Sequence, residues 1–225
     1  MEDNFKYLPE KYRGEYQQVE SIKSSNFAYF NTNYKSTQFG DKWKFKFRCY
    51  IDRAHDSLMG SNKTRNGQFT YWQKNNFFRF FVGRNDDYVF SVSYFRKDLE
   101  IHTFEKNHYE TRLDNAVRIA SSTLSTAIDK SFLLFGKGYC YIYSCQIHNP
   151  DNQLIIDYIP VIRKSDNVAG MLNIAPYAHL VDGEDVFHPS ETETPFIAGA
   201  VVALHKLPPT YFMELEAAIV KKNGL

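Results

Sequence analysis

The chain has 225 residues, with 27 lysines and arginines against 26 aspartates and glutamates, so its formal net charge is +1. This balance excludes a global field that would attract the protein to nucleic acid or to an anionic membrane. Aromatic residues make up 16% of the chain, and such side chains favour the half-buried surfaces of β-sheets. The composition therefore predicts a β-protein whose partners are neutral or recognised locally.

The N-terminal stretch MEDNFKYLPE is polar and acidic, and it has neither the basic nor the apolar region of a signal peptide. The longest apolar stretch, FIAGAVVAL at 196–204, is too short to cross a bilayer. We therefore expect a protein that is made and folded in the cytoplasm and is not inserted into a membrane.

Residues 42–52, KWKFKFRCYID, alternate strictly, with apolar side chains in one row and Lys42, Lys44, Lys46 and Arg48 in the other. This period of two predicts an antiparallel strand with one buried and one solvated face. The buried row would contain Trp43, Phe45, Phe47, Cys49 and Ile51. We interpret the basic row as a solvated face or a protected sheet edge rather than as a stripe that binds nucleic acid.

Short apolar runs separated by turn residues continue along the chain at the spacing of an all-β fold. They are FTYW at 69–72, FFRFFVG at 77–83, YVFSVSYF at 88–95, LEIHTFE at 99–105, HYETRL at 108–113, AVRIAS at 116–121, SFLLFG at 131–136 and two runs within 142–160. Asn149-Pro150-Asp151-Asn152 has the residues of a type I turn, so we predict a β-hairpin over 142–160.

Other pairs of residues that tolerate a left-handed backbone mark further turns. They are Asn75-Asn76, Asp86-Asp87, Asp114-Asn115 and Asp182-Gly183. Asp182-Gly183 suits a type I′ turn and predicts a hairpin over 179–188, HLVDGEDVFH. The cysteines imply no disulfide framework, because Cys140 and Cys145 would lie on opposite faces of one strand.

The many short strands and the absence of a long helical pattern predict an all-β fold, an antiparallel two-sheet sandwich or jelly roll, with a short C-terminal helix. We expect one domain over 1–205, ending near Pro208-Pro209. In the tail, 206–225, Thr210 would cap a helix that carries Phe212, Leu215 and Ile219 on one face. A helix of about three turns is marginal alone, so this face is predicted to serve docking or oligomerisation.

Two groups of residues carry a resemblance to a known family. The opening group is Leu8, Pro9, Tyr12, Tyr16, Val19, Glu20, Ile22, Ser24, Tyr29, Phe30 and Thr32. The closing group is Ile142, Tyr143, Ser144, Asp157, Tyr158, Ile159, Pro160, Gly170, Phe187, Phe196 and Gly199. Together they resemble concanavalin A-like, laminin G-like jelly-roll domains of the lectin and glucanase type, which are common in tailed-phage structural proteins and in gut bacterial surface proteins.

The resemblance spans about residues 8 to 199, with its motifs at the two ends. It departs from the family pattern at two places: the glycine usual near Asn26 is absent, and Met171-Leu172-Asn173 stands where relatives have Tyr-Asp. Any loop conformation or ligand contact that relatives place there is not carried over to this chain.

Glycoside hydrolases occur among folds of this type, and they need two carboxylates that flank the scissile bond. The candidate pairs, Asp98 with Glu100 and Glu191 with Glu193, are interpreted as surface acids, so no enzyme is predicted. Five residues of the 179–188 segment could suggest a metal site: His179, Asp182, Glu184, Asp185 and His188. The predicted turn accounts for them, and neither a metal nor a cofactor is predicted.

A binding function is the alternative to catalysis. Sugars need an apolar ring face for stacking together with fixed donors and acceptors for their hydroxyls. The residues near predicted strand ends that offer this mixture are Trp72, Asn75, Asn76, Arg84, Asp86 and Asp87. They are the predicted ligand-binding residues, although the same residue types also form turns.

The resemblance implies a non-enzymatic, lectin-like structural protein of a phage virion, a fibre, decoration or appendage protein that touches host surface glycans. The expected partners are other virion subunits or further copies of the chain as a homo-oligomer, with no nucleic acid. A bacterial cell surface is the alternative location to a virion assembled in the host cytoplasm. The alternative functions are a structural scaffold or clamp without ligand and a glycan hydrolase.

Overall fold

The computed structural model describes residues 7–24, 28–35, 44–51, 59–60, 70–74, 77–82, 86–91, 102–107, 110–114, 116–119, 131–134, 140–149 and 151–202. The elements are η1 (Glu10–Tyr12), β1 (Tyr16–Gln18), β2 (Ile22–Lys23), β3 (Phe30–Lys35), β4 (Lys44–Ile51), β5 (Met59–Gly60), β6 (Thr70–Lys74), β7 (Phe77–Val82), β8 (Asp86–Ser91), β9 (His102–Asn107), β10 (Glu110–Leu113), β11 (Ala116–Ile119), β12 (Ser131–Leu134), β13 (Cys140–His148), β14 (Leu154–Arg163), β15 (Val168–Asn173), α1 (His179–Asp182), β16 (Phe187–Pro189) and β17 (Ile197–Ala198).

Antiparallel strands dominate the described residues, where helix is limited to the single turns of η1 and α1. This confirms the predicted all-β character. None of the described helices is long and apolar enough to span a membrane.

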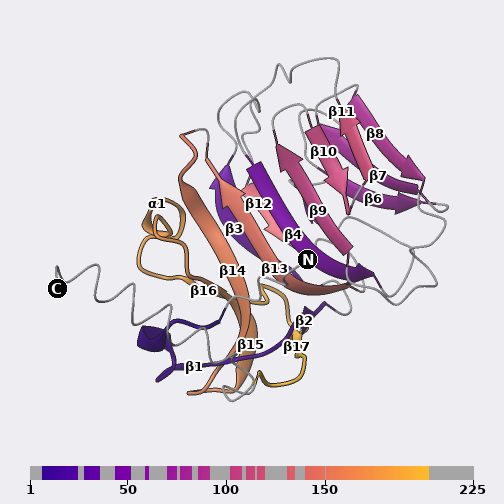
Figure 1. Cartoon of the computed structure of the whole chain (residues 1–225). Coiled ribbons are helices and arrows are strands. Elements are labelled where there is room, and N and C mark those ends of the chain that lie inside the picture. The colour runs from indigo at the N-terminus through magenta and orange to yellow at the C-terminus, as the bar shows by residue number, and fades with distance from the viewer. Residues whose placement is uncertain are drawn as a thin grey trace, which may run out of the picture.

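The strands form two sheets (Figure 1). The larger sheet has the order β11-β10-β9-β4-β13-β14-β15-β16, with β1 paired to β14 and β2 paired to β13 and β17. The smaller sheet has the order β3-β12-β5-β6-β7-β8. The consecutive strands β3 and β4 belong to different sheets, and so do β12 and β13. In the smaller sheet β3 pairs with β12, and in the larger sheet β4 pairs with β13.

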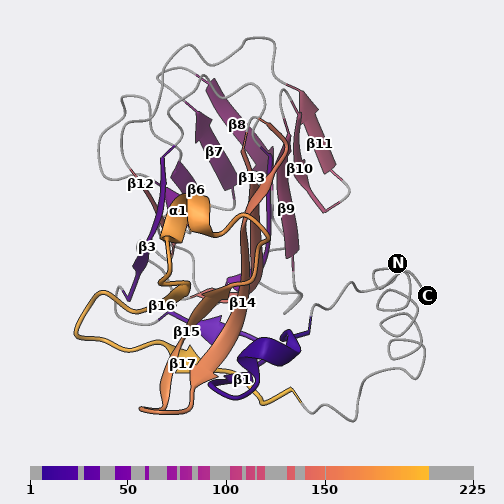
Figure 2. The same ribbon diagram turned by 90° about the vertical axis from the view of Figure 1, so that its left-hand side faces the viewer.

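The two sheets contact each other through Phe30 of β3, which is fully buried. Its ring lies edge-on to Tyr158 of β14 at 5.3 Å between centroids and stacks on His188 of β16 at 5.2 Å. The short helix α1 contacts both β3 and β14 and lies between them (Figure 2). Aromatic packing of this kind adds to the burial of large apolar surfaces and fixes how the two sheets meet.

A second apolar cluster covers the opposite face of β14, β15 and β16. The register aligns Ile159, Leu172 and Phe187 in one row across these strands. Leu8 and Tyr16 of the N-terminal segment pack on this row. The segment therefore buries the second face of the larger sheet, and this explains why β14 is apolar on both sides.

The N-terminal segment also pairs with the residues near 200. β2 is antiparallel to β17, and Val19 forms a bridge with Val201. The side chain of Gln18 accepts a hydrogen bond from the Leu8 amide at 2.7 Å, and its backbone carbonyl accepts one from the Val202 amide at 3.0 Å. Residues 8 and 202 thus meet at Gln18, at the end of the molecule opposite β6, β7 and β8 (Figure 1).

The hairpin predicted over 142–160 is confirmed as β13 and β14. The Asn152 amide donates to the Asn149 carbonyl at 2.9 Å, and the Asn149 side chain accepts hydrogen bonds from the amides of Asp151 and Gln153. These bonds satisfy the backbone of the turn locally.

Two turn predictions are wrong. Residues 179–188 form no hairpin: His179–Asp182 is the helix α1, and β16 pairs with β15 instead of folding back on the preceding residues. Gly183 follows this helix with φ +62° and ψ −121°, a backbone conformation that glycine adopts more readily than other residues. Asp86 and Asp87 are not a turn either, because they begin β8 and pair with Val82 and Phe81.

Several predicted features lie outside the described residues. They are the strand position Trp43, the tail 206–225 with Phe212, Leu215 and Ile219, the ligand candidates Asn75, Asn76 and Arg84, and the acids Asp98 and Glu100.

Candidate functional site

The strand β3 fixes which face of the smaller sheet is turned toward the larger one. Phe30 and Thr32 are fully buried, and Phe30 contacts the larger sheet. The alternate residues Asn31 and Asn33 are more exposed, as expected when successive residues of a strand lie on opposite faces. We name the two sides of the smaller sheet the Phe30 face and the Asn31 face.

The register extends this assignment across all strands of the smaller sheet. Directly paired residues share a face, so one row of positions runs across the sheet on the Asn31 face. The row consists of Asn31, Leu133, Gly60, Thr70, Phe81 and Asp87. Because residues two apart in a strand lie on the same face, Trp72 belongs to the Asn31 face with Thr70.

The structure therefore divides the predicted ligand residues. Trp72 in β6 and Asp87 in β8 lie on the Asn31 face, separated by β7. Asp86 lies on the Phe30 face, opposite Val82. The position directly opposite Trp72 is Arg79 of β7, which was not among the predicted ligand residues.

The two faces of β6, β7 and β8 differ in composition. The rows on the Phe30 face contain Tyr71, Phe80 and Tyr88, then Gln73, Phe78 and Phe90. The rows on the Asn31 face contain Thr70, Phe81 and Asp87, then Trp72, Arg79 and Val89, then Lys74, Phe77 and Ser91. Because Phe30 of the same sheet contacts the larger sheet, we interpret the Phe30 face as the core side and the Asn31 face as the solvated side. The Asn31 face is therefore the candidate ligand surface.

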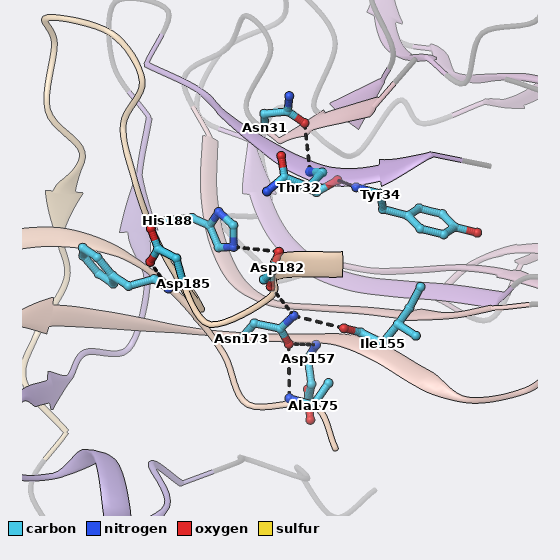
Figure 3. Close-up of polar contacts among 12 residues, drawn as sticks. Asn31, Thr32, Tyr34, Ile155, Asp157, Asn173, Ala175, Asp182, Asp185 and His188 are labelled. Carbon is cyan, nitrogen blue, oxygen red and sulfur yellow. Dashed lines mark hydrogen bonds and ion pairs between the residues drawn. The ribbon is translucent and has the colours of Figure 1, made fainter. Parts of the chain in front are cut away.

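A second group of polar residues is buried where α1 meets the larger sheet (Figure 3). Asn173, at the end of β15, is fully buried, and its carbonyl oxygen accepts hydrogen bonds from the amides of Asp157 and Ala175. Its amide nitrogen donates to the Ile155 carbonyl at 3.0 Å and to Asp182 Oδ2 at 2.6 Å. One side chain thus joins β14, β15 and α1 with a full set of hydrogen bonds.

The other carboxylate oxygen of Asp182 lies 3.2 Å from His188 Nε2, at ion-pair distance although neither atom is in hydrogen-bond geometry. The side chain of Asp182 is fully buried and that of His188 is 9% exposed. Nearby, the Tyr158 hydroxyl has no hydrogen-bond partner among the described residues. Burial raises the pKa of Tyr158 well above its ordinary value, and the Asp182 charge raises it further.

This buried group, which we call the Asn173 network, includes two residues of the proposed metal-binding set. Asp182 and His188 come together, whereas His179, Glu184 and Asp185 are exposed. No group of three histidine, cysteine, aspartate or glutamate side chains converges within the described part of the chain. The Asp182–His188 pair is closed off from solvent, so its contacts attach α1 to the larger sheet.

The candidate catalytic acids Glu191 and Glu193 and the buried thiol of Cys145 lie outside the Asn173 network. Glu191 and Glu193 are exposed, as predicted for surface acids, and the Glu191 carboxylate accepts a hydrogen bond from the Asn31 amide. Cys145 is a free cysteine without exposed surface, and burial raises the pKa of its thiol far above the usual range. A protonated buried thiol is a weak nucleophile.

No protein-family model matches the chain, and no curated protein matches it. The resemblance to concanavalin A-like domains therefore stays a prediction that depends on the sequence motifs.

Proposed function

We propose that this chain is a non-enzymatic, lectin-like structural protein of a phage virion, a fibre, decoration or appendage protein that binds host surface glycans. In this proposal its body is a concanavalin A-like jelly-roll sandwich. The observation that carries the binding function is the division of β6, β7 and β8 into an aromatic Phe30 face and a mixed Asn31 face.

The strand pairing supports the jelly-roll part of the proposal. In a jelly roll, two successive strands in different sheets pair with two other successive strands, so that one long hairpin folds over. Here β3 and β4 pair with β12 and β13, and the two pairs lie in different sheets. The contact of Phe30 with Tyr158 and His188 supports face-to-face packing of the sheets.

Among the described residues, the surroundings of Asp182 and Glu191 favour binding over hydrolysis. A glycosidase needs two carboxyl groups that both reach the scissile bond. Asp182, the last residue of α1, is buried against Asn173 and His188, and Glu191 accepts a hydrogen bond from the backbone of β3. Neither is placed as one of two opposed acids in an open cleft.

A glycan array tests the binding function. The protein would be displayed in multivalent form, because lectin sites are weak singly and gain by avidity. We expect binding to a subset of bacterial surface glycans. If no glycan is bound at high valency, the scaffold function replaces the lectin-like one.

The scaffold alternative has an observation of its own. Residues 8 and 202 meet at Gln18, so the chain enters and leaves the described region at one end. A spacer or clamp attached at that end fits this arrangement. Cross-linking of intact particles followed by mass spectrometry would identify neighbouring subunits, and cross-links to virion proteins are expected under both functions.

A further inference from the structure

We propose that the Asn31 face of β6, β7 and β8 binds an acidic glycan, with a sugar ring on Trp72 and a sugar carboxylate at Arg79. This inference rests on the proposed function and names its ligand class. It depends on strand register, which places residues of the three consecutive strands β6, β7 and β8 on one face.

The central pair is Trp72 and Arg79, which are directly opposite on β6 and β7. Cβ atoms of such cross-strand neighbours are about 5 Å apart. An indole offers an apolar face on which a sugar ring stacks, and a guanidinium matches the planar geometry of a carboxylate with two parallel hydrogen bonds. One uronic or sialic acid unit is large enough to use both groups.

The charges on this face favour an anionic sugar over a neutral one. Lys74 lies two residues from Trp72 on the same strand and the same face, and Asp87 lies diagonally from Arg79. This part of the face therefore carries two cations, Lys74 and Arg79, against the one anion Asp87, although the whole chain is nearly neutral. A carboxylate accepts hydrogen bonds from sugar hydroxyls, so Asp87 gives this face an acceptor that the two cations lack.

The test compares binding to oligogalacturonate with binding to galactose oligomers of the same length. The variants are Trp72→Ala, Arg79→Gln and Asp87→Asn, measured by calorimetry or by surface immobilisation of the sugar. Asp86→Asn is the matched control, because Asp86 is the neighbour of Asp87 in sequence but lies on the Phe30 face. Circular dichroism and thermal melts would check that each variant is folded.

We expect Arg79→Gln to weaken oligogalacturonate binding by about tenfold or more, since the change removes the charge and the two parallel hydrogen bonds to the sugar carboxylate. Trp72→Ala should weaken binding of both sugars, and Asp86→Asn should change neither. If Arg79→Gln does not fold, Arg79→Lys is the second variant: it keeps the charge but loses the paired hydrogen bonds, so a smaller loss is expected.

The possible failures are distinguishable. Wild-type protein that binds neutral glycans on the array but not oligogalacturonate would overturn the acidic ligand and leave the lectin-like function intact. Equal losses in Asp86→Asn and Asp87→Asn would overturn the assignment to the Asn31 face. A protein that binds no glycan in any form would overturn the lectin-like function and the acidic ligand together.

Discussion

At the scale of single residues, the Asn173 network contrasts a satisfied buried group with an unsatisfied one. Asn173 uses both ends of its amide, whereas the Tyr158 hydroxyl has no partner among the described residues. A buried polar group without a partner carries the whole cost of leaving water, while a paired group recovers it. The two side chains should therefore respond to truncation in opposite ways.

Replacing Tyr158 with phenylalanine should leave the free energy of unfolding unchanged or raise it by about 1 kcal/mol. The ring keeps its contacts with Phe30 and His188, and only the hydroxyl is lost. Urea denaturation of the wild type and the Tyr158→Phe variant measures the difference. A loss above about 1 kcal/mol would show that the hydroxyl has a hydrogen-bond partner in solution, such as a buried water.

Replacing Asn173 with alanine should lower the free energy of unfolding by about 3 kcal/mol or more. The change leaves the buried Asp182 carboxylate without its 2.6 Å donor and the amides of Asp157 and Ala175 without their acceptor. Gln17→Ala is the control, because Gln17 carries a similar amide on the exposed side of β1 and should change stability by less than about 0.5 kcal/mol. Similar losses in the two variants would contradict the importance of the network.

At the scale of elements, the close approach of β15 and β16 depends on Gly170. A Cβ atom at this position would lie 2.6 Å from the His188 carbonyl oxygen and 2.7 Å from the Phe187 ring. Gly170→Ala should therefore lower the free energy of unfolding by about 1 to 3 kcal/mol, the usual range for overpacking.

Gly14→Ala is the matched control for this prediction. No atom lies within 4 Å of a Cβ built at Gly14, and the backbone there is not left-handed. The variant should be unchanged in stability, or more stable by up to about 1 kcal/mol, because alanine restricts the unfolded chain. Thermal and urea unfolding of both variants would compare them, and equal effects would argue against the close contact at β15 and β16.

The same elements show how far the sequence could predict the fold. The hairpin over 142–160 was predictable because its determinants are local: the Asn149 side chain satisfies two amides within four residues of itself. The 179–188 segment was not, because an Asp-Gly pair suits a helix end as well as a turn. Pairing of β16 with β15 decides between them, and that partner lies outside the segment.

The candidate ligand surface was predictable only in part. Residue types suggested Trp72 and Asp87, but alternation within one strand does not tell which face meets the core. That assignment requires the strand pairing that links Asn31 to Leu133, Leu133 to Gly60 and Gly60 to Thr70. These residues are far apart in the chain, so the sequence alone does not show that they pair. The same information separates Asp86 from Asp87 and adds Arg79.

At the scale of the whole molecule, the core contains acidic groups that the folded state keeps protonated. Burial raises the pKa of Cys145 and of Tyr158, which are paired neighbours on β13 and β14. In the unfolded chain these groups ionise near pH 8.5 and near pH 10 respectively. The unfolded state therefore releases protons at alkaline pH while the folded state retains them.

The sign of the effect follows from this difference. The contribution of both groups to stability is fully present below about pH 8.5, and stability falls as the pH rises toward the folded-state pKa values. The slope approaches about 1.4 kcal/mol per pH unit for each group that is ionised only in the unfolded chain. We expect the free energy of unfolding to decline from about pH 8.5 and more steeply above pH 10.

Variants separate these two groups from the other titrating residues. Cys145→Ala should reduce the decline that begins near pH 8.5, and Tyr158→Phe should reduce the decline above pH 10, while each leaves the other part unchanged. Urea denaturation at intervals between pH 7 and pH 11 measures both slopes. Asp166→Asn is the control, because a hydrogen bond from Arg163 lowers the pKa of Asp166 and places its titration at acidic pH. The free energy of unfolding could instead fall with the same alkaline slope in all three variants and in the wild type. Cys145 and Tyr158 would then ionise as easily in the folded molecule as in the unfolded chain. That result would contradict a closed core between β13, β14 and Phe30.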